Sequence, residues 1–244
     1  MKLKIYYKSA TIWNVILFMF LSFIFVYLSN AVYLSESIFN KSFLISFVNS
    51  NKYLIVLFGL TALLTYRLSK KSKFFYIISS LVTIGLISNQ LVLDFSKLIT
   101  LILFLYIITA YYLFIFLKIE LEESYYNSLY SNEDLFEPML KQFTCKLISN
   151  ENSFSGYLTN WSETGFFVYL DEKLEKKLPK KIEVHLSYEG VEFKCITQVV
   201  AKTVDSHGIG LKVIQTPEDT EVDASWFGFY DIIDKMGYQV EYLK

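Results

Sequence analysis

The chain has 244 residues, of which 53% are hydrophobic, and a formal net charge of −1 at pH 7. This near-neutral total hides two halves of opposite charge. Residues 1–117 hold ten Lys or Arg against two acids, whereas residues 118–244 hold 13 Lys against 22 acids. The acidic half argues against nucleic-acid binding, because phosphate contacts need clustered Lys and Arg. Two cysteines are too few for a disulfide framework, and no Cys/His cluster indicates a metal site.

The first half contains apolar stretches that are long enough to be membrane-spanning helices, since a bilayer core needs about 17–25 mostly apolar residues per helix. They cover residues 10–28, 52–68, 74–93 and 98–117. The first stretch is too long for the apolar part of a signal peptide, and no small-residue cleavage site follows it. No charged residue lies deep in a stretch, so nothing indicates transport. We therefore predict a four-helix transmembrane region at residues 1–117.

Positive charges predict the orientation of these helices, because Lys and Arg are enriched in cytoplasmic loops. One cluster precedes the first helix and another separates the second from the third: Lys2, Lys4 and Lys8, then Arg67, Lys70, Lys71 and Lys73. The other two loops carry one lysine each, Lys41 and Lys97. We expect both termini in the cytoplasm.

Residues 118–137 are predicted to form a helical connector. Leu117, Leu121, Tyr125 and Leu129 recur every four residues, the spacing of one helical face. Pro138 ends such a helix. The connector is either a rod that transmits movement from the membrane or a simple spacer.

Residues 138–244 are predicted to form an all-β domain, because short runs of Val, Ile, Phe and Tyr alternate with turn residues. The expected strands are 142–149, 155–160, 165–171, 180–188, 191–203 and 208–215. Glu189-Gly190 predicts a tight hairpin between the fourth and fifth strands. A helix at about 218–236 is expected to cover the mouth of a six-stranded antiparallel barrel.

Two motifs give this domain a resemblance to a known family. Asn160-Trp161-Ser162-Glu163-Thr164-Gly165 fits the pattern [D/N]xSxxG between the second and third strands, and Gly208-Ile209-Gly210-Leu211-Lys212-Val213 forms a glycine-containing last strand. The domain resembles PilZ, the bacterial receptor module for cyclic di-GMP. The resemblance implies that Asn160, Ser162 and Gly165 contact the nucleotide, with Lys141 as a further candidate. Alternatively, the two polar side chains only cap a turn through local hydrogen bonds. Gly165 is expected to adopt a positive φ.

The chain departs from the family at one point. PilZ receptors usually carry RxxxR just before the first strand, and these arginines grip phosphate and stack on guanine. The single arginine of this chain is Arg67, between two predicted membrane helices. Lys141 and Lys146 stand near the expected position but lack the planar fork of a guanidinium. We expect weak or absent nucleotide binding and no resident cofactor.

These features favour a non-enzymatic, multi-pass protein of a bacterial inner membrane that signals or acts as an adaptor. Its predicted partners are the lipid bilayer, a protein at the membrane and, optionally, cyclic di-GMP. The alternative is a structural membrane protein whose barrel scaffolds an assembly independently of nucleotide. His185 and His207 lie on different predicted elements and suggest neither a metal site nor a catalytic triad.

Overall fold

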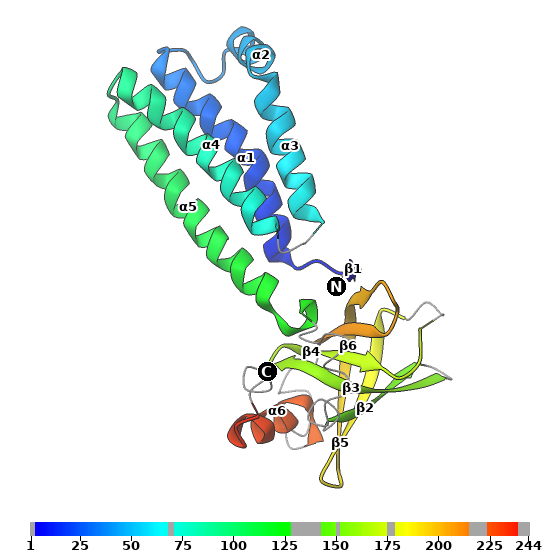
Figure 1. Cartoon of the computed structure of the whole chain (residues 1–244). Helices are drawn as coiled ribbons and strands as arrows, with labels where there is room; N and C mark the ends of the chain where they lie inside the picture. Colours follow the sequence, from blue (N-terminus) through cyan, green and yellow to red (C-terminus); the bar gives the residue numbers. More distant parts are fainter. Residues whose placement is uncertain are drawn as a thin grey trace. The chain divides into compact units, whose positions relative to one another are not determined.

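The computed structural model describes residues 3–67, 71–127, 143–149, 152–174, 179–214 and 224–238. The chain forms two compact units (Figure 1). One is helical and consists of Ser9–Leu121; the other combines Glu122–Lys244 with Met1–Lys8. The short N-terminal segment therefore belongs to the β-rich unit.

The second unit is built on the predicted six-stranded antiparallel barrel, which the structure confirms. The strands are β2 Thr144–Ser149, β3 Asn152–Ser162, β4 Gly165–Leu170, β5 Lys181–Tyr188, β6 Val191–Thr203 and β7 Gly208–Val213. Their order around the sheet is β6-β5-β2-β3-β4-β7, and pairing between β6 and β7 closes the barrel. Glu189 and Gly190 form the expected tight hairpin, with φ values of 49° and 82°.

Alternation of side chains fills the barrel. On β5, Ile182, Val184 and Leu186 are buried in the core cluster, whereas the residues between them face outward. The mouth is covered by α6, Trp226–Lys235, whose Trp226, Phe229 and Ile233 are fully buried. This helix falls within the predicted range, of which residues 218–223 lie outside the described residues.

A further strand, β1 at Leu3–Ile5, was not expected. It pairs antiparallel with the far end of β6, with Leu3 opposite Thr203. The backbone N–H groups of Tyr6 and Tyr7 also donate to the Val200 carbonyl, at 2.8 and 3.3 Å. The residues directly before the first long helix are thus held by the barrel.

The helical unit contains α1 Ala10–Tyr33, α2 Lys41–Ser50, α3 Lys52–Tyr66, α4 Ser72–Leu93 and α5 Lys97–Glu122. Among the described residues, α1, α4 and α5 are each long and apolar enough to cross a membrane. The pair α2 and α3, bent by 69°, is a fourth candidate if it counts as one span. Figure 1 shows α1, α3, α4 and α5 as rods running alongside one another. The helix α2 occupies part of the predicted loop at residues 29–51.

The interior of this unit is rich in small and hydroxyl-bearing residues. The buried face of α4 consists of Ser72, Tyr76, Ser79, Ser80, Thr83 and Ile87. The Tyr76 hydroxyl donates to the Ala110 carbonyl at 2.8 Å, and the hydroxyls of Ser22 and Tyr106 lie 3.0 Å apart. Aromatic rings such as Phe18 and Tyr106, stacked at 5.1 Å, add to the packing of α5.

Within its described part, residues 118–127, the connector is α-helical through Glu122, where α5 ends. Ser124–Tyr126 then form a 3₁₀ turn, and Asn127 is extended. Residues 128–142 lie outside the described residues, and with them Leu129, Pro138 and Lys141.

Candidate functional site

The signature motif forms the hairpin between β3 and β4. Ser162 pairs with Gly165, and Glu163 and Thr164 make the two-residue turn between them. The register shifts between Leu158 and Asn160, a bulge that lies directly before the motif. Asn160, Ser162 and Gly165 therefore come together at one end of the hairpin, as the sequence implied.

Position 165 requires a glycine because neighbouring atoms leave no room for a side chain. The expectation of a positive φ at Gly165 is wrong, because the described positive-φ glycines are Gly190 and Gly237. A Cβ on Gly165 would lie 2.4 Å from the Leu211 carbonyl oxygen and 2.9 Å from Cδ1 of Tyr125. The missing side chain thus lets β7 and Tyr125 approach closely.

The polar groups of the motif are hydrogen-bonded to the segment that follows α5. The Ser124 hydroxyl lies 2.9 Å from the Ser162 hydroxyl and donates to the Gly165 carbonyl at 2.7 Å. The Asn160 amide donates to the Asn127 carbonyl at 2.8 Å. Ser162 also contacts the Gly165 carbonyl at 3.2 Å, so local capping and long-range contact coexist at this side chain.

A carboxylate completes this contact. The Thr164 hydroxyl donates to Oε2 of Glu123 at 2.6 Å, and the Ser162 hydroxyl lies 3.5 Å from the same oxygen. Glu123 breaks the α-helix here, with φ −55° and ψ 141°. The segment thus turns out of the helix at the residue that first contacts the motif.

Tyr125 packs directly against Gly210 on β7. A Cβ at Gly210 would lie only 1.9 Å from the Tyr125 carbonyl oxygen and 2.8 Å from its carbonyl carbon. The Lys212 ammonium lies 5.8 Å from the centre of the Tyr125 ring, within the range of a cation–π contact. Tyr125 is 2% exposed.

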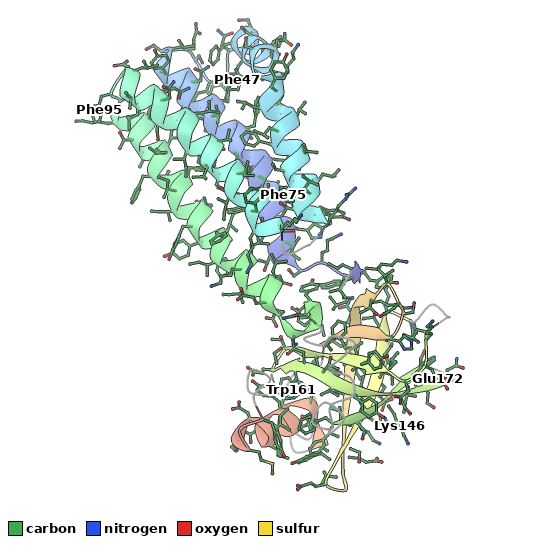
Figure 2. The ribbon with its side chains drawn as sticks, viewed as in Figure 1. Phe47, Phe75, Phe95, Lys146, Trp161 and Glu172 are labelled. Carbon is green, nitrogen blue, oxygen red and sulfur yellow. The ribbon has the colours of Figure 1, made fainter. Side chains whose placement is uncertain are left out.

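The core side of the motif is held by the closing helix. The indole N–H of Trp226 donates to the Glu163 carbonyl at 3.0 Å, and its ring lies 4.4 Å from that of Phe166. Trp161, labelled in Figure 2 beside α6, donates its indole N–H to the Tyr238 carbonyl at 3.3 Å. The hairpin is therefore fixed from within by two tryptophans.

The lysine that lies at the motif is not one of those expected from the sequence. Lys141 lies outside the described residues, and Lys146 is an exposed side chain on β2. The cation at the motif is Lys212, which stands opposite Gly165 in the β4–β7 register. Lys212 belongs to the second motif, Gly208–Val213, and this membership is the sequence signal that could have identified it as a site residue.

The remaining reactive side chains have structural surroundings. His185 lies 2.8 Å from the Glu183 carboxylate on the same strand, and the ring of His207 stacks on Tyr169. Cys145 and Cys195 are buried, and burial raises the pKa of both thiols, which disfavours the reactive thiolate. Within the described part of the chain, no group of His, Cys, Asp or Glu could hold a metal ion.

A closed six-stranded antiparallel barrel with a C-terminal helix and a [D/N]xSxxG hairpin defines the class of fold. The model of the PilZ domain matches residues 139–225, and we assign this part of the chain to that family. PilZ domains bind cyclic di-GMP or protein partners, and they are generally not enzymes.

Two solved structures are similar to this region. One is an uncharacterized Legionella protein, with 15% identity, a TM-score of 0.28, and coverage of 39% of this chain and 90% of that protein. The other is the PilZ domain of CeSA from a cellulose-synthesizing bacterium, with 15% identity, a TM-score of 0.28, and coverage of 40% and 93%. No curated protein matches the chain.

Proposed function

We propose that this chain is a membrane-anchored, non-enzymatic PilZ protein that acts as a signalling or adaptor module, with weak or absent binding of cyclic di-GMP. One observation carries the proposal: the polar side chains of the signature motif are already hydrogen-bonded to the chain's own Glu123–Asn127 segment. An external ligand must displace these contacts before it can use the same groups.

The distribution of side chains in the helical unit supports a membrane anchor. Large apolar residues such as Leu17, Phe20 and Phe104 are more than half exposed, whereas Ser22, Thr65 and Thr83 are completely buried. This pattern is unfavourable in water. It suits lipid, where small and hydroxyl-bearing residues mediate helix packing.

The pairing of β1 supports a four-span topology with both termini on one side. Residues 3–5 precede α1, and the barrel follows α5, yet β1 and β6 are hydrogen-bonded. A chain that enters and leaves on the same side crosses a membrane an even number of times. Since α1, α4 and α5 account for three crossings, α2 and α3 together supply the fourth. The lysine clusters support the assignment of that side to the cytoplasm of a bacterial inner membrane.

The missing arginines support weak nucleotide binding. A hydrogen bond to a charged group contributes about 1.5–3 kcal/mol. Losing two such anchors weakens binding by roughly 3–6 kcal/mol, or about two to four decades in Kd. The ammonium of Lys212 offers a point charge at the motif but no planar fork.

Calorimetric titration of the full chain in lipid nanodiscs with cyclic di-GMP tests the proposal. We expect a Kd of about 10⁻⁵ M or weaker, since neutral hydrogen bonds from Asn160 and Ser162 nearly balance those lost to water. Ser162→Ala, compared with the exposed Ser187→Ala on β5, identifies binding at the motif. Submicromolar binding that Ser162→Ala abolishes would instead establish a true receptor with another phosphate grip.

Reporter fusions test the topology. A reporter that is active only in the cytoplasm should work after Lys244 and within the 67–73 loop, because both positions are expected on the lysine-rich side. A fusion near Lys41 serves as the control and should be inactive. Activity at Lys41 together with inactivity after Lys244 would reverse the orientation.

A further inference from the structure

One face of the barrel carries the Asn160–Gly165 motif, and the segment Glu123–Asn127 contacts this face as a bound peptide would. We propose that this face is an intramolecular peptide-docking site whose ligand is the chain's own juxtamembrane segment, which closes the site until it withdraws. The inference rests on the proposed function only for the identity of the external ligand. The docking itself is defined by contacts within the barrel unit.

The polar groups of the segment and of the site are hydrogen-bonded to one another. The Glu123 carboxylate accepts from Thr164, the Ser124 hydroxyl donates to the Gly165 carbonyl, and the Asn127 carbonyl accepts from Asn160. Two of these contacts use the segment's side chains and one uses its backbone. The site therefore recognises both the side chains and the backbone of the segment, as peptide-binding sites do.

The glycine at position 210 shapes the site for a peptide backbone. The three heavy atoms nearest to a Cβ built at Gly210 are the carbonyl oxygen, carbonyl carbon and Cα of Tyr125. Gly210 does not have a positive φ, so its backbone accepts an L-residue. The backbone of the docked segment thus occupies the space left by its missing side chain.

A second conformation is available to the segment. Leu117, Leu121 and Tyr125 have the spacing of one helical face, which favours continuation of α5. The structure instead ends α5 at Glu122 and forms a 3₁₀ turn over Ser124–Tyr126. An α-helix through this region would advance 1.5 Å per residue along the axis of α5. Because the docked path leaves the helix at Glu123, continued helix and docked segment exclude each other.

This exclusion makes the end of α5 a switch. In the docked state the polar groups of the motif are occupied, and in the helical state they are open to a ligand. The docked state is also tied to the N-terminal segment, because the Tyr126 hydroxyl donates to the Tyr7 carbonyl at 3.2 Å. Both juxtamembrane segments therefore stabilise the closed site.

A disulfide trap measures docking without any nucleotide. Ser124→Cys and Ser162→Cys in the full chain in nanodiscs replace hydroxyls that lie 2.9 Å apart. We expect rapid, near-complete crosslinking under mild oxidation. The pair Ser124→Cys and Ser153→Cys is the control, because Ser153 lies at the opposite end of β3, and it should not crosslink. Equal crosslinking of the two pairs would overturn the inference.

Substitutions that disfavour docking test the mechanism when they are added to the Ser124→Cys, Ser162→Cys pair. Gly210→Ala should slow crosslinking at least tenfold, because its Cβ overlaps the Tyr125 carbonyl. Gly85→Ala is the matched control, since a Cβ there meets nothing within 4 Å, and it should leave the rate unchanged. If Gly210→Ala loses its near-UV circular dichroism signal, the barrel has not folded, and Glu123→Ala becomes the deciding variant. Glu123 lies outside the barrel strands, and its substitution should slow crosslinking about threefold. An unchanged rate in Glu123→Ala and in a folded Gly210→Ala would overturn the switch.

Cyclic di-GMP titration of the native chain and of Glu123→Ala separates this inference from the proposed function. A gain of about tenfold or more in affinity on Glu123→Ala supports gating of the site. Submicromolar binding of equal strength in both proteins would overturn gating. If neither protein binds while the trap forms, docking is retained and the absent binding agrees with the proposed function, but gating of a cyclic di-GMP site is overturned.

Discussion

The barrel and the helical unit arrange similar apolar side chains in opposite ways. In the barrel, Leu147, Phe166 and Leu170 are completely buried. In the helical unit, Leu101 and Phe104 are more than half exposed, while Ser79 and Thr83 are buried. Hydrophobic content alone therefore does not define a core. In this chain each unit matches its outer surface to a different solvent, water for the barrel and, as we propose, lipid for the helices.

The largest effect should come from emptying the barrel core. Trp226→Ala removes a fully buried ring that packs on Phe166 and a hydrogen bond to Glu163. We expect a loss of about 3–5 kcal/mol in the unfolding free energy. Urea denaturation of the full chain in nanodiscs, followed by near-UV circular dichroism, measures it. Phe104→Ala, an aromatic truncation on the exposed face of α5, is the control and should change barrel stability by less than about 0.5 kcal/mol. Similar losses in both variants would show that the buried ring of Trp226 has no special role in the stability of the barrel.

A charge on the outside of the helical unit should lower membrane recovery, whereas a charge on the outside of the barrel should not. Leu105→Arg lies on α5 with half of its surface exposed, and a charge at a helix centre is disfavoured by about 2.5–3.5 kcal/mol in membrane insertion. The fraction of protein recovered in membranes should fall. Val191→Arg, equally exposed on the barrel, should leave that fraction unchanged. Normal membrane recovery of Leu105→Arg would show that this face of α5 does not contact lipid.

The smallest effect should come from a buried hydroxyl between helices. Tyr106→Phe removes the contact with Ser22 but keeps the ring that stacks on Phe18. Interhelical hydrogen bonds in membranes contribute about 0.6 kcal/mol on average, so we expect a loss of that size in thermal or denaturant unfolding of the helical unit. In the barrel, Thr197→Val leaves the Ile182 carbonyl without its hydroxyl donor and should cost about 1 kcal/mol or more. A larger loss in Tyr106→Phe would contradict this ranking.

Most of the barrel could be predicted from the sequence, because its alternating strands and turn residues are local signals. The boundaries of β5 and β6 agree within one residue with those expected. The strand β1 could not be predicted, because three residues carry little pattern and the lysines in and around them suggested a membrane flank. The 3₁₀ turn at Ser124–Tyr126 could not be predicted either. Its sequence favours a helix, and contacts with residues distant in the sequence, such as Gly165 and Gly210, favour the turn.

The sequence predicted the residues of the candidate site but not the segment that is hydrogen-bonded to them. Asn160, Ser162 and Gly165 come together as the motif implied. The partner that fills their hydrogen bonds lies more than thirty residues earlier in the chain, as the separation of Asn127 from Asn160 illustrates. No local pattern encodes such a contact. Lys212 was missed for a related reason, because only the β4–β7 register brings it opposite Gly165.

The pairing of β1 with β6 also determines an order of events during synthesis. Leu3 leaves the ribosome early, but its partner Thr203 is made about two hundred residues later. The N-terminal strand must therefore wait until the barrel is almost complete, and closing so long a loop is entropically unfavourable. Pairing between β1 and β6 is therefore a late contact, which can form only after the strands between them in the sequence have been made.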